Sequence, residues 1–257
     1  TTAADNTAVG TSSLGANTTG HSNTAVGKDA LLANTSADYN TAIGWNTLIA
    51  NTANLNTAVG AAALGANTTG AENVAVGSNA LDANTEGSSN VAVGQGALDT
   101  NTTASNNTAV GHDSMKSNTT GAENVAVGKG ALNANTTGPS NTAVGRSALL
   151  ANTTASDNTA VGKGALLANT TGQANTSMGS GALDANTTAS SNTAAGCNSL
   201  TANTTGAENT AVGRGSMSSS TTGNNNAALG FNALASNTTA SNNTAVGSSA
   251  LGANTTG

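Results

Sequence analysis

Apolar and polar residues alternate along this chain in a 17-residue motif, N-T-A-V-G-x-x-A-L-x-A-N-T-T-G-x-x, which is repeated fifteen times with substitutions. The copies begin at Asn6, Asn23, Asn40 and Asn56 and then at every seventeenth residue to Asn243, and only the copy over 40–55 is one residue shorter. A period this strict is typical of a solenoid, in which each repeat packs only on its neighbours. We therefore expect residues 1–257 to form one continuous repeat segment rather than a globular domain.

Each copy contains two segments with the alternation of β-strands. Counted from the Asn as position 1, positions 1 to 5 carry Asn, Thr or Val, Ala, Val and Gly, and positions 8 to 13 read A-L-x-A-N-T. Neither segment has the length of an ordinary helix, and the Gly, Asn, Ser and Thr residues between them favour turns. The pattern predicts an all-β fold, a parallel β-solenoid or β-roll of fifteen 17-residue coils with two short strands per coil.

Two positions carry the large apolar side chains. Position 9 is Leu in thirteen copies, among them Leu132 and Leu149, and Met in two, and position 4 is Val in eleven. We expect both positions to face inward. Position 5 is Gly in every copy, which predicts a positive φ or an approach too close for a Cβ; the clearest examples are Gly10, Gly27, Gly111 and Gly128.

Asparagine recurs at two positions of the motif. It fills position 1 in all fifteen copies and position 12 in all but one, as at Asn135 and Asn152. In a stack of coils, like side chains lie above one another, and amides can donate and accept along such a column. We expect both columns to form hydrogen-bonded ladders.

Position 3 carries the argument for self-association. It is Ala in fourteen copies, as at Ala126 and Ala143, whereas the outward position 10 varies freely. An invariant small residue opposite the β-branched positions 2 and 4 predicts a strand buried on both faces. A single thin coil offers no second layer, so we expect another copy of the chain to cover that face, in a homo-oligomer with this strand nearest the axis.

Composition narrows the function classes. The net charge is −6 and only 7% of residues are charged, which argues against nucleic acid as a partner. No apolar run approaches the 18 residues of a membrane span. The chain begins at Thr1 inside a repeat-like stretch and ends at Gly257 before a period closes, so we expect a piece of a longer chain.

The charged residues provide one candidate site and argue against catalysis. His112, Lys129, Arg146 and Lys163 occupy position 6 in four successive copies, which predicts a basic strip for an acidic ligand such as a surface glycan; the alternative is a solvated edge that opposes aggregation. Any ligand is expected at the variable positions 6, 7 and 10. No metal cluster, cofactor motif, nucleophile–base set or carboxylate pair can be assembled, so we expect neither a cofactor nor an enzyme.

Threonine suggests a rival function. Position 13 is Thr in every copy and position 14 is Thr in most, and a face of regularly spaced Thr can bind ice. Such a face works best with two outward ranks from a T-x-T spacing, whereas here the threonines are adjacent, so only one of them can point outward. An ice-binding solenoid with a Thr-rich face is therefore the alternative hypothesis.

The motif N-T-A-V-G-x-x-A-L-x-x-N-T-T-G, from Asn6 to Gly257, resembles the head repeats of trimeric autotransporter adhesins of the YadA-like class. It is closer still to the longer repeats of bacteriophage tail-fibre and related fibrous surface proteins. The resemblance implies a left-handed β-roll trimerised about its axis, with the N-x-x-x-G strand innermost. It also implies attachment to a receptor or surface, outside the cell or on a virion. One departure is position 6, often Tyr in those repeats but mostly polar here.

Overall fold

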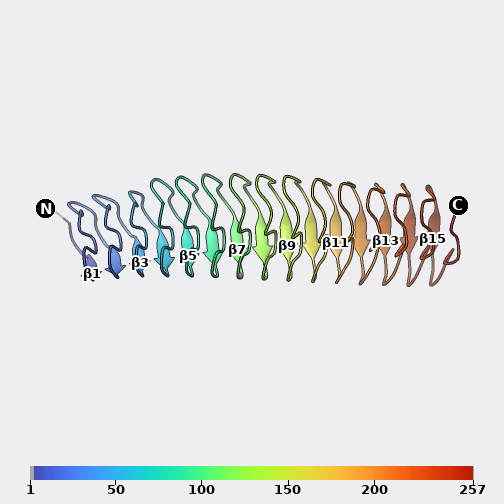
Figure 1. Cartoon of the computed structure of the whole chain (residues 1–257), viewed down its shortest axis with the longest axis horizontal. Coiled ribbons are helices and arrows are strands. Elements are labelled where there is room, and N and C mark those ends of the chain that lie inside the picture. Colours follow the sequence, from blue (N-terminus) through green and yellow to red (C-terminus); the bar gives the residue numbers. More distant parts are fainter. Residues whose placement is uncertain (1–2, 257) are drawn as a thin grey trace. The chain divides into compact units, whose positions relative to one another are not determined.

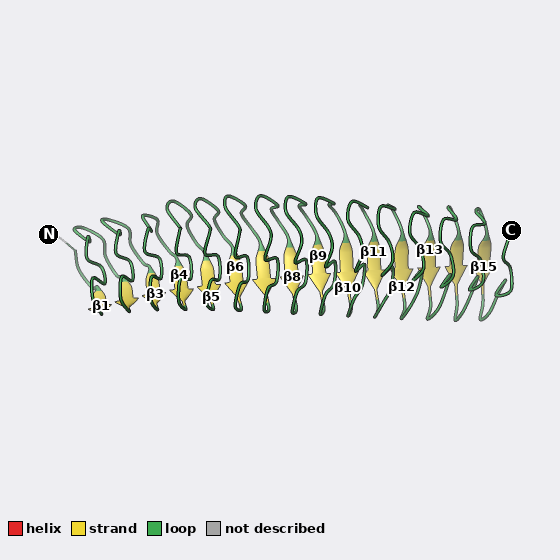
Figure 2. Ribbon diagram, in the orientation of Figure 1, coloured by secondary structure: helices red, strands yellow, loops and turns green. Residues whose placement is uncertain are grey.

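The computed structural model describes residues 3–256, in which each copy of the motif contributes one three-residue strand and the rest of the coil is made of turns (Figure 1 and Figure 2). The chain divides into two compact units, the first ending at Asn124 and the second beginning at Val125. Each unit is an all-β solenoid built from the same repeat. The predicted fold class is therefore confirmed at the level of a parallel β-solenoid with a 17-residue coil.

Every strand covers motif positions 2 to 4. The described strands of the first unit are β1 (Thr7–Val9), β2 (Thr24–Val26), β3 (Thr41–Ile43), β4 (Thr57–Val59), β5 (Val74–Val76), β6 (Val91–Val93) and β7 (Thr108–Val110). Those of the second unit are β8 (Val125–Val127), β9 (Thr142–Val144), β10 (Thr159–Val161), β11 (Thr176–Met178), β12 (Thr193–Ala195), β13 (Thr210–Val212), β14 (Ala227–Leu229) and β15 (Thr244–Val246).

Within each unit, strands that follow one another in sequence pair in parallel and in register. Thr159 of β10 lies beside Thr142 of β9 and Thr176 of β11, and the same holds for the other positions. Every position of the motif therefore stacks on the same position of the next coil. This stacking turns a one-residue pattern in the sequence into a column of like side chains.

The second predicted strand, over positions 8 to 13, is wrong. Residues at positions 7 and 9 have positive φ throughout, as at Gly164 (φ 63°) and Leu166 (φ 54°), and strands do not alternate in this way. The segment still joins coils through its backbone. Gly164 N–H donates to the Arg146 carbonyl of the preceding coil, and Leu166 N–H donates to the Ala182 carbonyl of the following coil, at 3.0 and 2.9 Å.

The left-handed backbone explains why position 9 is only ever Leu or Met. All fifteen residues there have φ between 49° and 54°, a region that costs an L-residue about 1–2 kcal/mol. A β-branched side chain crowds the backbone further in this region. Val and Ile would fill the core comparably, but the column contains only unbranched-Cβ side chains such as Leu132, Leu149, Met115 and Met217.

The invariant Gly at position 5 meets both demands that its conservation along the chain predicted. Gly10, Gly27, Gly111 and Gly128 have φ between 131° and 136°. A Cβ added at Gly128 would lie 2.7 Å from the carbonyl carbon and oxygen of Gly145 in the next coil. Because backbone rather than a movable side chain occupies that space, only Gly fits.

Each unit has a narrow core of small and medium side chains. Ala126 and Ala143 at position 3 and Leu132 and Leu149 at position 9 are fully buried, at 0% exposure. Position 4 does not join them: Val161 remains 37% exposed. The prediction that positions 4 and 9 both face inward is thus right for position 9 and wrong for position 4. Because strand side chains alternate, Ala at position 3 points into the coil and its two neighbours point out.

Buried asparagine ladders hold the coils together, as predicted. The Asn152 amide nitrogen donates to Asn135 Oδ1 at 2.9 Å, and Asn169 Nδ2 donates to Asn152 Oδ1 at 3.1 Å. The two ladders meet at position 15, where Asn158 Nδ2 and Asn169 Nδ2 both donate to the Gly172 carbonyl at 2.9 Å. These contacts satisfy polar groups that would otherwise be buried at a cost of about 1–3 kcal/mol each.

The short coil over 40–55 keeps its strand in register. Thr41 of β3 pairs with Thr57 of β4, and the Asn56 N–H still donates to Asn40 Oδ1 at 2.9 Å. The missing residue is absorbed in the turn, where Asn51 Nδ2 reaches a carbonyl two residues ahead, that of Ala53, instead of three. The irregularity of the short coil is therefore confined to one turn.

Candidate functional site

The outward face of the strands is apolar and only half covered. Position 3 is buried in β2 to β15, whereas positions 2 and 4 are half-buried or exposed on each described strand. In the second unit Met178 is 51% and Leu229 50% exposed, and in the first unit Ile43 is 40% exposed. We call this surface, formed in each unit by positions 2 and 4 of its strands, the sheet face.

The prediction that a second copy of the chain covers position 3 is wrong. Alanines such as Ala126 and Ala143 are buried by their own chain, against the Leu column, and need no second copy to cover them. The strand is not buried on both faces within the chain. The surface without cover is instead the Val-rich side that the sequence had placed in the core. Position 4 carries mainly Val, with Ile, Met and Leu, and position 2 beside it carries mainly Thr and Val. This composition is typical of a surface that packs against another apolar surface rather than one exposed to solvent.

A second candidate surface follows each strand, at positions 6, 7 and 10. The structure places Lys129, Arg146 and Lys163 in consecutive coils of the second unit, directly after β8, β9 and β10, and all three are exposed. His112 belongs to the first unit, where its Nδ1 lies 3.1 Å from Asp113 Oδ2. Three of the four predicted strip residues are thus brought together in one unit.

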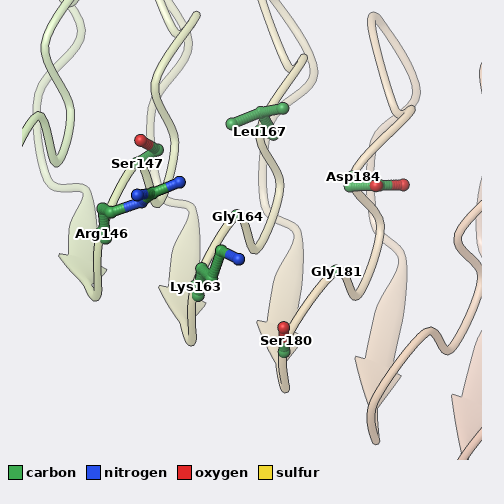
Figure 3. Close-up of a pocket in the computed structure, with 8 residues that line it drawn as sticks. All are labelled: Arg146, Ser147, Lys163, Gly164, Leu167, Ser180, Gly181 and Asp184. Carbon is green, nitrogen blue, oxygen red and sulfur yellow. The ribbon is translucent and has the colours of Figure 1, made fainter.

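Beside the end of this basic row lies a hollow of about 270 Å³ (Figure 3). Its lining comes from three consecutive coils at positions 6, 7 and 10, the positions expected to contact a ligand: Arg146, Ser147, Lys163, Gly164, Leu167, Ser180, Gly181 and Asp184. In Figure 3 the Arg146 and Lys163 side chains both extend toward the following coil. The hollow therefore has cationic groups on one side and a carboxylate on the other.

Gly164 opens the hollow. A Cβ at Gly164 would meet nothing within 4 Å, whereas a Cβ at Gly181 would lie 2.8 Å from Asn198 Oδ1 and 3.9 Å from Asp184 Oδ2. Position 7 carries Ser147 and Asn198 in the coils on either side. The signal that could have located this site in the sequence is the pair of glycines at position 7 in successive copies, next to two cations at position 6.

The wall opposite the cations is already ordered by the fold. The Thr201 hydroxyl donates to Asp184 Oδ1 at 2.8 Å, and Oδ2 of the same carboxylate lies 3.9 Å from the Cβ position of Gly181. Leu167, at position 10 of the middle coil, is half-buried, and Ser180 is exposed. Sequence reasoning pointed to position 10 in general as a place for ligand contact, but it did not single out Asp184, Leu167 or Ser180.

Carboxylates at position 10 of the first unit form a different environment. Partial burial raises the pKa of Asp82, and the neighbouring charge of Asp99 raises it further. Burial also raises the pKa of Asp99, where Lys116 opposes the effect and Asp113 adds to it. Lys116 Nζ lies 3.1 Å from Asp113 Oδ1. Stacked like charges along a column thus carry a cost that a cation in the next coil partly offsets.

Comparison with known proteins identifies no relative: no family model, no curated protein and no solved structure matches the chain. Within residues 3–256, no group of three or more His, Cys, Asp or Glu side chains is arranged to hold a metal ion. The same residues contain no helix that is long and apolar enough to cross a membrane.

Proposed function

We propose that this chain is a structural, non-enzymatic segment of an extracellular attachment fibre, on a cell surface or a virion, which assembles as a homotrimer through the sheet face. The observation that carries the proposal is that face: a parallel array of outward Val, Ile, Met and Leu side chains which the chain itself leaves half exposed. The resemblance of the repeat to adhesin heads and tail fibres supports the same assembly.

A second copy of the chain is the occupant that suits this surface. The in-register stack repeats the same side chains once per coil in each unit, so a partner with a different spacing would match one coil and miss the next. A copy of the same chain has the matching spacing. Positions 2 and 4 carry no charge in any of the fifteen repeats, so apolar sheet faces can meet without burying unpaired charges.

The gain from covering the face is substantial. Fully burying a Val, Leu, Ile or Met side chain contributes about 1.5–3 kcal/mol. With roughly a third to a half of several side chains still open, as at Val76 (37%), Met178 (51%) and Leu229 (50%), each contributes about 0.5–1.5 kcal/mol on assembly. Summed over many coils, this is enough for stable association, because the strands are already ordered within the chain.

The test is the mass of the purified chain in solution by light scattering. We expect three times the 24.2 kDa of one chain for the wild type, and dissociation when Val161 and Met178 are both replaced by Lys. The matched control replaces the exposed Thr154 and Thr171 at position 14 by Lys and should keep the wild-type mass. A wild-type chain that stays monomeric at micromolar concentration would refute the assembly.

Ice binding remains the alternative, and the geometry gives it one rank of threonines. Position 14 is exposed at Thr137 and Thr154, but at position 13 the Thr153 hydroxyl donates to the Thr170 carbonyl at 3.2 Å and is half-buried. A thermal hysteresis measurement separates the two proposals. Activity lost on replacing the outward threonines of position 14 with bulky residues would favour ice binding over the fibre.

A further inference from the structure

We propose that the hollow beside Arg146 and Lys163 binds a single anionic sugar residue of a surface polysaccharide. The proposal rests on the attachment role proposed above and names the ligand class of that role. It is argued from four properties of the hollow: its paired cations, its opposing carboxylate, its apolar side and its size.

The paired cations select a negative charge. Arg146 and Lys163 occupy the same motif position in consecutive coils, and both side chains border the hollow (Figure 3). A guanidinium presents a planar fork of donors that matches a carboxylate or sulfate, and an ammonium adds a second charge. The chain has only six Lys and Arg residues and a net charge of −6. Two adjacent cations beside one hollow therefore make this part of the surface locally positive on a negatively charged chain.

The opposite wall disfavours a simple inorganic anion. Asp184 lines the hollow with a carboxylate whose Oδ1 accepts from Thr201 and whose Oδ2 lies 3.9 Å from the Cβ position of Gly181. A carboxylate repels an anion without donors but accepts hydrogen bonds from hydroxyl groups. The ligand therefore carries a negative charge at one end and hydroxyl donors at the other, which is the chemistry of an acidic sugar.

Apolar contact and size agree with one sugar ring. Leu167 is half-buried in the lining, where it can pack against the carbon-bound hydrogens of a ring face, and the Ser180 hydroxyl is available to the ring substituents. The volume of about 270 Å³ is just below the range of pockets for drug-sized ligands, about 300–1,000 Å³. The hollow thus accommodates one residue of a chain that continues into solvent.

A substitution at Gly164 can fill the hollow without damage to the fold. Asn occupies the position of Gly164 in other coils, as at Asn46, Asn79 and Asn198, with φ between 53° and 56°. The backbone at position 7 therefore accepts Asn. Because a Cβ at Gly164 meets nothing within 4 Å, Gly164→Asn should fill the hollow rather than strain the coil.

The experiment measures binding of the whole chain to three oligosaccharides of equal length by titration calorimetry: one with uronic acid residues, one sulfated and neutral otherwise, and one neutral. We expect binding of an acidic oligosaccharide and none of the neutral one, and the two acidic probes distinguish carboxylate from sulfate as the charged group. Gly164→Asn and the double variant Arg146→Ala, Lys163→Ala should each weaken binding at least about tenfold. Lys129→Ala, which removes a cation of the same row outside the hollow, should change it less than about twofold.

Asp184→Ala separates a sugar site from general charge attraction. Removal of a negative charge would strengthen attraction of any polyanion, whereas loss of a hydroxyl acceptor weakens binding of a sugar. Tighter binding by Asp184→Ala, equal binding of the neutral oligosaccharide, or equal binding of a poly-glutamate peptide would each overturn the proposal. The mass of every variant is measured alongside, so a chain that assembles but binds no acidic sugar refutes only this inference, and a monomer refutes only the assembly.

Discussion

A single gap in an asparagine ladder provides the sharpest test of how this solenoid is held together. Position 12 is Asn in every coil except the one that carries Ser220. Both Asn203 Oδ1 and Ser220 Oγ are buried and have no hydrogen-bond partner among the described residues. In the intact part of the ladder, the Asn203 amide donates to Asn186 Oδ1 at 3.0 Å. Ser220→Asn should restore the missing link and raise the free energy of unfolding.

The magnitude follows from the groups that the new amide would satisfy. A donor to Asn203 Oδ1 removes a buried unsatisfied acceptor, which is worth about 1–3 kcal/mol. A second bond, to the Gly223 carbonyl, as Asn203 and Asn237 make to the equivalent carbonyls in the neighbouring coils, adds about 0.5–1.5 kcal/mol. Ordering the longer side chain costs about 1 kcal/mol. The net expectation is a stabilisation of about 0.5–3.5 kcal/mol from one buried substitution.

The assay is thermal or denaturant unfolding followed by far-ultraviolet circular dichroism. Wild type and variant are compared at one protein concentration, because self-association would make the midpoint depend on concentration. A chain of this size gains about 2–4 °C in Tm per kcal/mol. The matched control is Ser219→Asn, the same change at the neighbouring exposed serine, which should alter stability by less than about 0.5 kcal/mol. If Ser220→Asn is neutral or destabilising while the control behaves as expected, the ladder is not what stabilises the stack.

Two further predictions test the backbone and the charges. Leu149 is buried and has φ 51°. Leu149→Met should lower the free energy of unfolding by less than about 1.5 kcal/mol, whereas Leu149→Ile should lower it by about 2–3 kcal/mol, because β-branching opposes the left-handed region. Equal costs of the two substitutions in denaturant unfolding would contradict this reasoning. Because Asp82 and Asp99 have pKa values raised above 3.8, the folded chain binds their protons more tightly than the unfolded chain, so their contribution to stability increases as the pH falls from neutral through the raised values toward 3.8. Replacing both by Asn should stabilise the chain at neutral pH, with an advantage that shrinks over this window in pH-dependent melts; an advantage that grows on acidification would contradict the sign.

The repeat by itself determined most of the architecture. Gly128 and its equivalents require a backbone that no Cβ can enter, and Asn135 and Asn152 require partners above and below them, so a stack of coils follows from the motif. The strand over positions 2 to 4 also follows from local preference. Position 9 carried a further signal in the absence of Val and Ile, which distinguishes a left-handed turn from a strand, although alternation alone suggested the strand.

Only the tertiary structure decided which way each face points. A strand such as β10 reads the same whether Ala160 or Val161 faces the core, because alternation has a period of two and fixes the faces only relative to one another. The narrow coil settles the choice: with Leu166 buried in the interior, position 3 admits only a small side chain, Ala or the equally buried Ser177, and Val161 is left outside at 37% exposure. The same limit applies to the candidate site. The sequence places Lys163 and Asp184 at positions 6 and 10 of different copies, and only the stacking of coils brings them to one hollow.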